Sequence, residues 1–253
     1  MAHPLNKPVL NKDESRVIDG YGLLQPRIGV SVDSASRSLF SLTFSGQTGI
    51  DPYTTAVSDV YQDLFHEGIF TGKGIYDPHI FNKLLKKAIP ENAILSHDLL
   101  EGSYVRAGLA SDIELIDGYP ANYISYSLRL HRWVRGDWQL LPWLFSRVRN
   151  FEGEKVVNPI NIISKWKILD NMRRSLVFPT LYLIIILSFI ILPGSLGLWM
   201  GLTFLTLLLP LITDLANKLL SDRDKTSQVA FPSLFEGTRS LIIQTALTFF
   251  FIA

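Results

Sequence analysis

The hydrophobic pattern divides this chain into two parts. No charged residue occurs from Ser175 to Thr213, a run of 39 residues, and Pro193-Gly194-Ser195 splits that run into two pieces of 18 residues each. A Pro-Gly pair is a strong turn signal, and a membrane-spanning helix needs about 20 apolar residues, with about 17 as a lower limit. The pattern therefore predicts a hairpin of two transmembrane α-helices with spans near 175–192 and 196–213. The alternative is a buried hairpin inside a soluble protein.

A third apolar stretch covers residues 241–253 and ends with the sequence. Thirteen residues are too few to span a bilayer comfortably. We therefore expect a truncated third span, and a chain that is an internal piece of a longer protein or a split or truncated gene product.

The charges around the apolar run predict its orientation, because cytoplasmic flanks carry an excess of Lys and Arg. The turn at 193–195 has no charge, whereas cations lie on both outer flanks, at Lys165, Lys167, Arg173 and Arg174 before the first span and at Lys218, Arg223 and Lys225 after the second. This places both flanks and the soluble half in the cytoplasm and the short turn outside. Residues 1–11 have no apolar core, so we expect no signal peptide.

The pattern of the first 160 residues alternates between strand and helix. Such alternation is typical of an α/β layer structure. The expected elements are a strand over Tyr21–Val32 broken by Pro26, helices beginning at Asp51-Pro52 and at Asp77-Pro78, a helix from a Ser96 cap to Ala107 closed by Gly108, a strand over Asp112–Ile116, and a helix over Asn122–Trp138.

Composition narrows the function classes. The chain has 253 residues, is 47% hydrophobic and has a net charge of +1, so intrinsic disorder is excluded and no general electrostatic attraction to nucleic acid is expected. It contains no cysteine. Disulfide scaffolds, thiolate zinc sites and cysteine nucleophiles are therefore excluded.

The glycine-rich run GIFTGKG, residues 68–74, is similar to a phosphate-binding loop but does not fit it. A P-loop needs four residues between the first Gly and Gly-Lys, followed by Ser or Thr. Here three residues intervene, and Gly74 follows Lys73. A turn whose glycines let the backbone approach another group is the favoured interpretation.

Ser96-His97-Asp98 is not a hydrolase triad, because three consecutive side chains cannot converge in the geometry of one. The five histidines also show no metal-ligand pair at helical spacing. What remains is the Asp98 carboxylate at the start of a helix. It is either a first-turn residue favoured by the helix dipole or a functional carboxylate.

Arg129, Arg132 and Trp133 lie three and four positions apart, on one face of the expected helix. Arginine presents a planar donor fork that suits diphosphate oxygens, and tryptophan offers a flat face on which a sugar can stack. The alternative is a juxtamembrane cationic cluster, since basic residues with tryptophan also suit the headgroup region.

The order of these motifs resembles that of processive, membrane-embedded inverting glycosyltransferases of the GT-A superfamily, such as cellulose and hyaluronan synthases. In this resemblance Ser96-His97-Asp98 replaces the T-E-D motif, and Arg129-x-x-Arg132-Trp133 corresponds to Q-x-x-R-W with Arg in place of Gln.

Longer runs are similar to the glycosyltransferase domain of bacterial cyclic β-1,2-glucan synthases. They are GYGLLQPRIGVSV (20–32), DPYTTAVSDVYQDLFHEGIFTGKGIYD (51–77), LSHDLLEG (95–102), HRWVRGDWQLLPW (131–143) and KWKILDNMRRSLVFPT (165–180). The resemblance implies that residues 1–160 are the C-terminal part of a cytoplasmic, Rossmann-like GT-A domain and that 161–253 are the membrane region of a multi-pass protein in a bacterial inner membrane. The family's nucleotide-binding strand and D-x-D motif lie upstream of the region seen here.

The resemblance also implies a reaction, the inverting transfer of glucose from UDP-glucose to a growing β-1,2-glucan. It makes Asp98 the catalytic base, places Arg132 and Arg129 at the pyrophosphate and Trp133 on the acceptor sugar, and gives Phe70, Thr71 and Gly72 the acceptor site. A divalent cation, Mg²⁺ or Mn²⁺, is expected for the family, with ligands outside this chain.

The partners implied are UDP-glucose, a glucan acceptor, the lipid bilayer and the remainder of the synthase. Without the donor-binding part, this chain alone is expected to be inactive. Two alternatives stay open: a catalytically inactive membrane-anchored remnant, and a synthase of another β-glucan, such as a cellulose-like polymer.

Overall fold

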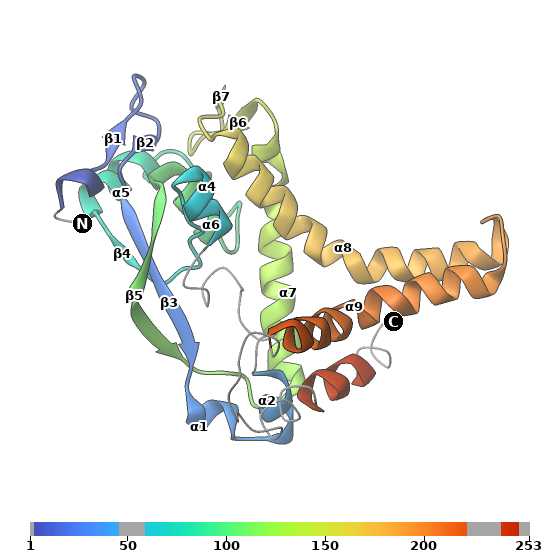
Figure 1. Ribbon diagram of the computed structural model, residues 1–253. Helices are drawn as coiled ribbons and strands as arrows, with labels where there is room; N and C mark the ends of the chain where they lie inside the picture. The colour runs from blue at the N-terminus through green and yellow to red at the C-terminus, as the bar shows by residue number, and fades with distance from the viewer. Residues whose placement is uncertain (1–2, 46–58, 222–238, 248–253) are drawn as a thin grey trace.

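The computed structural model describes residues 3–45, 59–221 and 239–247 (Figure 1). The described part mixes helices with short sheets. The elements of the first half are η1 (Pro4–Asn6), β1 (Val9–Leu10), β2 (Val17–Asp19), β3 (Leu23–Val30), α1 (Val32–Ala35), α2 (Leu39–Phe44), α4 (Val60–Phe65), β4 (Ile75–Tyr76), α5 (Pro78–Leu85) and α6 (Asp98–Val105). Those of the second half are β5 (Ala107–Asp117), α7 (Tyr123–Gln139), η2 (Leu141–Leu144), β6 (Arg147–Arg149), β7 (Lys155–Val157), α8 (Ile162–Ile190) and α9 (Leu196–Ser221). Residues 239–247 are also helical.

The main sheet has the strand order β4-β3-β5, in which β3 and β5 run parallel and β4 is antiparallel to β3. The expected break of the first strand at Pro26 is wrong, because β3 continues through this residue. The register with β5 instead shifts between Pro26 and Arg27. Proline cannot donate a ladder hydrogen bond and is tolerated in strands at such irregularities.

Helices α4, α5 and α6 lie between β3 and β5 in the sequence, as a connection between parallel strands requires. In Figure 1, α4 and α6 lie on the side of the sheet that faces α7 and α8. The hydrophobic core joins these layers. It includes Leu23 of β3, Leu100 and Val105 of α6, Leu140, and Ile168 of α8.

Three expected helices are confirmed, with changes at their ends. Asp77 caps α5, accepting hydrogen bonds from the backbone of His79 and Ile80, and Asn122 caps α7. The expected Ser96 cap is wrong, since His97 occupies the N-cap position of α6 without a side-chain cap bond.

The C-terminal end of α6 also differs from the expectation. The helix stops at Val105, Arg106 takes a positive φ of 59°, and Gly108 lies inside β5 against the ring of Tyr21. The expected strand over 112–116 is confirmed as the second half of β5. The helix start at Asp51-Pro52 lies outside the described residues, and Asp59 caps α4.

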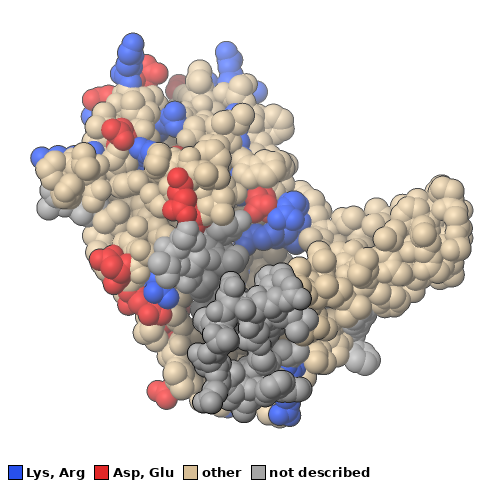
Figure 2. Space-filling view, viewed as in Figure 1, with Lys and Arg blue, Asp and Glu red and all other residues tan. Residues whose placement is uncertain are grey.

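The α8 and α9 helices form a hairpin that projects from the rest of the molecule (Figure 1). Both are long and apolar enough to cross a membrane by length and composition, over Ile162–Ile190 and Leu196–Thr213, and only 6% of the most apolar part of each is buried. The predicted turn contains Gly194, at a φ of +100°. The visible face of the hairpin carries no charged side chain in Figure 2.

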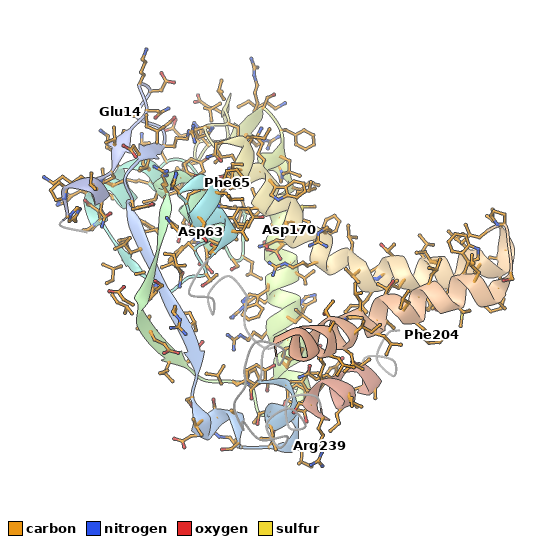
Figure 3. All side chains as sticks on the ribbon, in the orientation of Figure 1. Glu14, Asp63, Phe65, Asp170, Phe204 and Arg239 are labelled. Atoms are coloured by element: carbon orange, nitrogen blue, oxygen red, sulfur yellow. The ribbon has the colours of Figure 1, made fainter. Side chains whose placement is uncertain are left out.

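The exposure of the hairpin argues against a buried soluble one. Phe189 and Ile190 of α8 are 68% and 70% exposed, and Phe204 of α9, labelled in Figure 3, is 41% exposed. An apolar surface of this extent is typical of contact with lipid or another protein.

The first third of α8 is different, because it packs into the soluble half. Ile168 and Met172 belong to the common hydrophobic core, and Asp170, labelled in Figure 3, lies on the part of α8 beside α7. The helix therefore begins about a dozen residues before the expected span. The prediction of a boundary near residue 160 stays a prediction.

Candidate active site

Asp98 is the first residue of α6 and lies against the glycine-rich segment 67–74. A β-carbon at Gly72 would lie 2.8 Å from Oδ2 of Asp98, and Gly72 has a φ of +93°. Glycine adopts this backbone conformation without steric cost. The close backbone approach expected for the glycine-rich run is therefore confirmed at Gly72.

The segment 67–74 is held from the side of the sheet by β3. Gln25 is fully buried and accepts hydrogen bonds from the backbone N–H of Thr71 at 2.9 Å and from its hydroxyl at 3.3 Å. A β-carbon at Gly74 would clash with the carbonyl oxygen of Leu24. Contacts with the central strand β3 thus fix the position of the loop that faces Asp98.

From the other side, α6 packs on Phe70. A β-carbon at Gly102 would lie 2.9 Å from Cβ of Phe70, and Phe70 belongs to the hydrophobic core. Its ring is therefore buried and does not offer an open surface to a ligand. Phe70 was expected to line an acceptor site. Its ring instead packs in the hydrophobic core against α6, where it anchors the loop.

The environment of Asp98 raises the pKa of its carboxyl. Burial is the largest cause and the negative charge of Glu101 the second, while His97, a hydrogen bond from Ser96 and the charge of Arg132 act in the opposite direction. The Ser96 hydroxyl lies 3.4 Å from Oδ2 of Asp98. A carboxylate with a raised pKa holds a proton more strongly, as a general base must.

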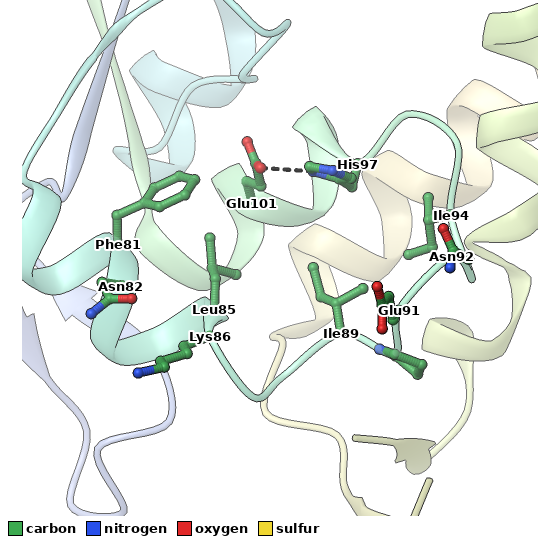
Figure 4. Close-up of a pocket in the computed structure, with 11 residues that line it drawn as sticks. Phe81, Asn82, Leu85, Lys86, Ile89, Glu91, Asn92, Ile94, His97 and Glu101 are labelled. Atoms are coloured by element: carbon green, nitrogen blue, oxygen red, sulfur yellow. Dashed lines mark ion pairs between the residues drawn. The ribbon is translucent and has the colours of Figure 1, made fainter. Parts of the chain in front are cut away.

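His97 does not pair with Ser96, in agreement with the rejection of a hydrolase triad. Its Nδ1 lies 2.7 Å from Oε1 of Glu101, and that hydrogen bond is the main cause of a raised His97 pKa. Figure 4 shows this pair at the edge of a pocket of about 410 Å³ between α5, the 89–94 loop and α6. None of the sequence-predicted site residues lines that pocket.

Helix α7 is fixed against the start of α6 near its own C-terminal end. Oε1 of Gln139 accepts a hydrogen bond of 2.7 Å from the backbone of Leu95, and a β-carbon at Gly136 would lie 2.9 Å from Cβ of Ser96. This contact explains how the charge of Arg132, one turn before Gly136, reaches Asp98. The structure thus brings Asp98 and Gly72 into contact, and the charge of Arg132 acts on Asp98 from α7.

Arg129, one turn before Arg132 on α7, forms a second group with Trp133. The guanidinium carbon of Arg129 lies 4.5 Å from the centre of the Trp133 ring, in a cation–π contact. Trp133 is 38% exposed. Arg129 therefore occupies one face of the ring that was expected to stack on a sugar.

Sequence reasoning missed Asp117, the last residue of β5, which joins this second group to the glycine-rich segment. Its Oδ2 contacts Nζ of Lys73 and lies 3.7 Å from a guanidinium nitrogen of Arg129. Partial burial raises the pKa of Asp117, but the hydrogen bonds from Lys73 and from the backbone of Gly118, with the charges of Lys73 and Arg129, outweigh it and lower that pKa. No local motif marks Asp117, because Lys73 lies 44 residues away in the chain.

Asp137 and Trp138 connect α7 to α8. Oδ1 of Asp137 accepts a hydrogen bond of 3.3 Å from Asn171, and the indole N–H of Trp138 donates one of 3.0 Å to Ser175. The helix that carries Arg129 and Arg132 is therefore attached to the hairpin where it leaves the soluble half.

The divalent cation that the resemblance implies, with its ligands outside this chain, stays a prediction. Within residues 3–45, 59–221 and 239–247, no group of three or more His, Asp or Glu side chains could hold a metal ion.

Comparison with known proteins finds a related sequence. No family model matches the chain. It is 49% identical over 176 residues to a cyclic beta-(1,2)-glucan synthase, NdvB, of Rhizobium meliloti (strain 1021), and the match covers 69% of this chain but 6% of that protein. The resemblance found in the sequence is therefore confirmed: over this stretch the chain is related to a segment of a cyclic β-(1,2)-glucan synthase.

Proposed function

We propose that this chain is part of a larger glucan synthase that transfers glucose from UDP-glucose to the 2-hydroxyl of a growing β-1,2-glucan, with inversion. The arrangement of Asp98 against Gly72, within reach of the charge of Arg132, carries the proposal. The relationship to the synthase supports the glucan chemistry, and the α8–α9 hairpin supports a membrane location.

In the proposed reaction, Asp98 takes the proton of the acceptor hydroxyl as that oxygen attacks the anomeric carbon of the donor. A new C–O bond forms on the face opposite the nucleotide, and the bond between the anomeric carbon and the β-phosphate oxygen breaks. One displacement of this kind inverts the configuration. A positioned base typically contributes about 10²–10⁴-fold to the rate.

The leaving group of this reaction is a diphosphate, so it needs positive charge more than a proton. Arg132 and Arg129 lie on one face of α7, and both have the bidentate geometry that suits phosphate oxygens. Electrostatic stabilisation of this type acts where negative charge develops in the transition state. The exposed part of the Trp133 ring would contact the acceptor sugar.

The bilayer would receive the α8–α9 hairpin with both outer flanks in the cytoplasm and the turn at 193–195 outside. Under that orientation the soluble half faces the cytoplasm of a bacterial inner membrane. A tag placed in the turn should be accessible from the external side alone, and labelling from the cytoplasm would overturn this topology.

Replacing Asp98 tests the reaction. In membranes that contain a complete synthase with this segment, Asp98→Asn should lower incorporation of labelled glucose into glucan by at least about 10²-fold. Asp112→Asn, an exposed carboxylate on β5, is the matched control and should keep normal activity. Near-normal activity of Asp98→Asn would remove Asp98 from the mechanism.

The pH profile of the same assay adds a check. Since burial and Glu101 raise the pKa of Asp98, the base loses its free carboxylate as the pH falls through a value above the ordinary range of an aspartate. The rate should therefore decline on the acid side at a pH higher than an unperturbed carboxyl would give.

An inactive remnant is the second candidate, since this chain spans 6% of the length of its relative. Binding of UDP-glucose to this chain alone would decide how much of the donor site it holds.

A further inference from the structure

The proposed site contains a cluster of three charged residues, and the reaction proposed above gives a role to only one of them, Arg129. Lys73 of the glycine-rich segment, Asp117 at the end of β5 and Arg129 of α7 meet at a single carboxylate oxygen, Oδ2 of Asp117. The other oxygen, Oδ1, accepts a hydrogen bond of 2.9 Å from the backbone of Gly118. The carboxylate is therefore fixed at the end of its strand, whereas the two cations reach it with long side chains.

This cluster is open to solvent. The side chains of Lys73, Asp117 and Arg129 are 43%, 33% and 32% exposed. Exposed ion pairs typically contribute only about 0–1 kcal/mol. Their partners can therefore exchange when a more highly charged anion arrives.

The cluster also adjoins the reacting carboxylate. Lys73 follows Gly72, the residue in contact with Asp98, and Arg129 lies one helical turn from Arg132, whose charge acts on Asp98. Three cations from two separate elements are thus linked to the proposed base, Lys73 through its neighbour Gly72 and the two arginines through α7. A lysine binds phosphate as a point charge and complements the bidentate arginines.

We infer that Lys73 is a further diphosphate-binding residue and that Asp117 is a resident counter-ion, which holds Lys73 and Arg129 in place and is displaced from them by the diphosphate. This inference rests on the proposed function. It assigns opposite effects to two residues that touch each other: Lys73 favours anion binding, and Asp117 competes with it.

The test is the binding of inorganic pyrophosphate, in EDTA, to the full 253-residue chain in detergent or nanodiscs, measured by calorimetry. Asp117→Asn is isosteric and keeps an oxygen for Gly118. It should tighten pyrophosphate binding about two- to fivefold, the scale of competition by an exposed ion pair. Lys73→Met should weaken binding by a similar factor.

Matched controls separate this effect from non-specific attraction. Arg135→Gln on α7 and Asp112→Asn on β5 each remove one exposed charge, of opposite sign, from the elements that carry Arg129 and Asp117, and neither should change the affinity by as much. Unchanged or weaker binding in Asp117→Asn overturns the inference, since a carboxylate that only positions its cations would lose affinity when removed. So does unchanged binding in Lys73→Met.

The outcome is distinguishable from failure of the proposed function. Pyrophosphate binding needs no glucosyl transfer, so an active Asp98→Asn synthase would contradict the reaction and leave the binding pattern as measured. A synthase that depends on Asp98 but lacks the binding pattern would contradict this inference alone.

Discussion

A buried ion pair holds the start of the glycine-rich segment 67–74, and an exposed ion pair lies at its end. At its start, the side chains of Lys167 and Glu67 are 5% and 11% exposed and their charged atoms lie 3.0 Å apart. Nζ of Lys167 also donates to the backbone carbonyls of Glu67 and Gly68, at 3.3 and 2.9 Å. At its end, Lys73 pairs with Asp117 in an exposed position.

These two ion pairs show how one loop can be held firmly at one end and still exchange its partner at the other. A buried charge that loses its partner stays desolvated and is costly, whereas an exposed one is solvated by water. The start of the segment is therefore fixed to α8, and its tip beside Asp98 is free to exchange partners.

The largest effect is expected at the buried end. Lys167→Met leaves Glu67 buried without its cation, and the free energy of unfolding should fall by about 3–5 kcal/mol. Thermal unfolding of the chain in detergent, followed by near-ultraviolet circular dichroism, measures this loss. Lys165→Met is the control, since the Lys165 side chain is only half-buried and donates a single hydrogen bond of 3.3 Å, to the backbone carbonyl of Phe145.

A double variant sharpens this first prediction. Lys167→Met with Glu67→Gln removes both charges and should recover part of the lost stability, because the remaining cost is no longer that of an unpaired buried charge. If the single variant is as stable as the Lys165 control, the start of the segment is not fixed by this pair.

A smaller effect is expected in the middle of the segment. Gly72→Ala puts a β-carbon against Asp98 at a φ of +93°, and backbone strain of this type costs about 1–3 kcal/mol. Gly153→Ala is a matched control, because Gly153 has a φ of +81° and nothing within 4 Å of the position of a β-carbon.

The two glycine variants should lose similar stability in the same unfolding assay. Only Gly72→Ala should also lose glucan synthesis in a complete synthase, since only this residue touches the proposed base. Equal activity of the two variants would contradict a role for the Gly72 contact in the reaction.

The smallest effect is expected at the exposed end. Asp117→Asn should change the free energy of unfolding by less than about 1 kcal/mol, and added salt should reduce even that difference. Unfolding at low and at high salt measures both. A loss as large as that of Lys167→Met would mean that the two ends do not differ in kind.

Much of the fold could be predicted from local pattern. The uncharged run and its Pro-Gly turn predicted the hairpin, and Asp77-Pro78 and Asn122 marked helix starts that the structure contains. These signals succeed because they depend on residues only a few positions apart.

The site was predictable only in part, because its contacts are distant in sequence. Asp98, Arg129 and Arg132 came from motif order, whereas Asp117 and Gln25 belong to no motif and act through partners 44 and 46 residues away. Lys167 was counted as a flanking cation that orients the hairpin. The structure instead buries it against Glu67, 100 residues earlier, so charge counting alone misjudged its role.

The continuity of α8 has a consequence for distance. The 13 residues from Ile162 to Arg174 rise about 20 Å along the helix axis before the uncharged run begins. In the membrane arrangement proposed above, this stretch is a spacer of fixed length, because its first turns are packed in the core and joined to Glu67. The distance between the proposed site and the lipid surface would then be constant. A growing polymer would therefore always enter the membrane region from the same distance.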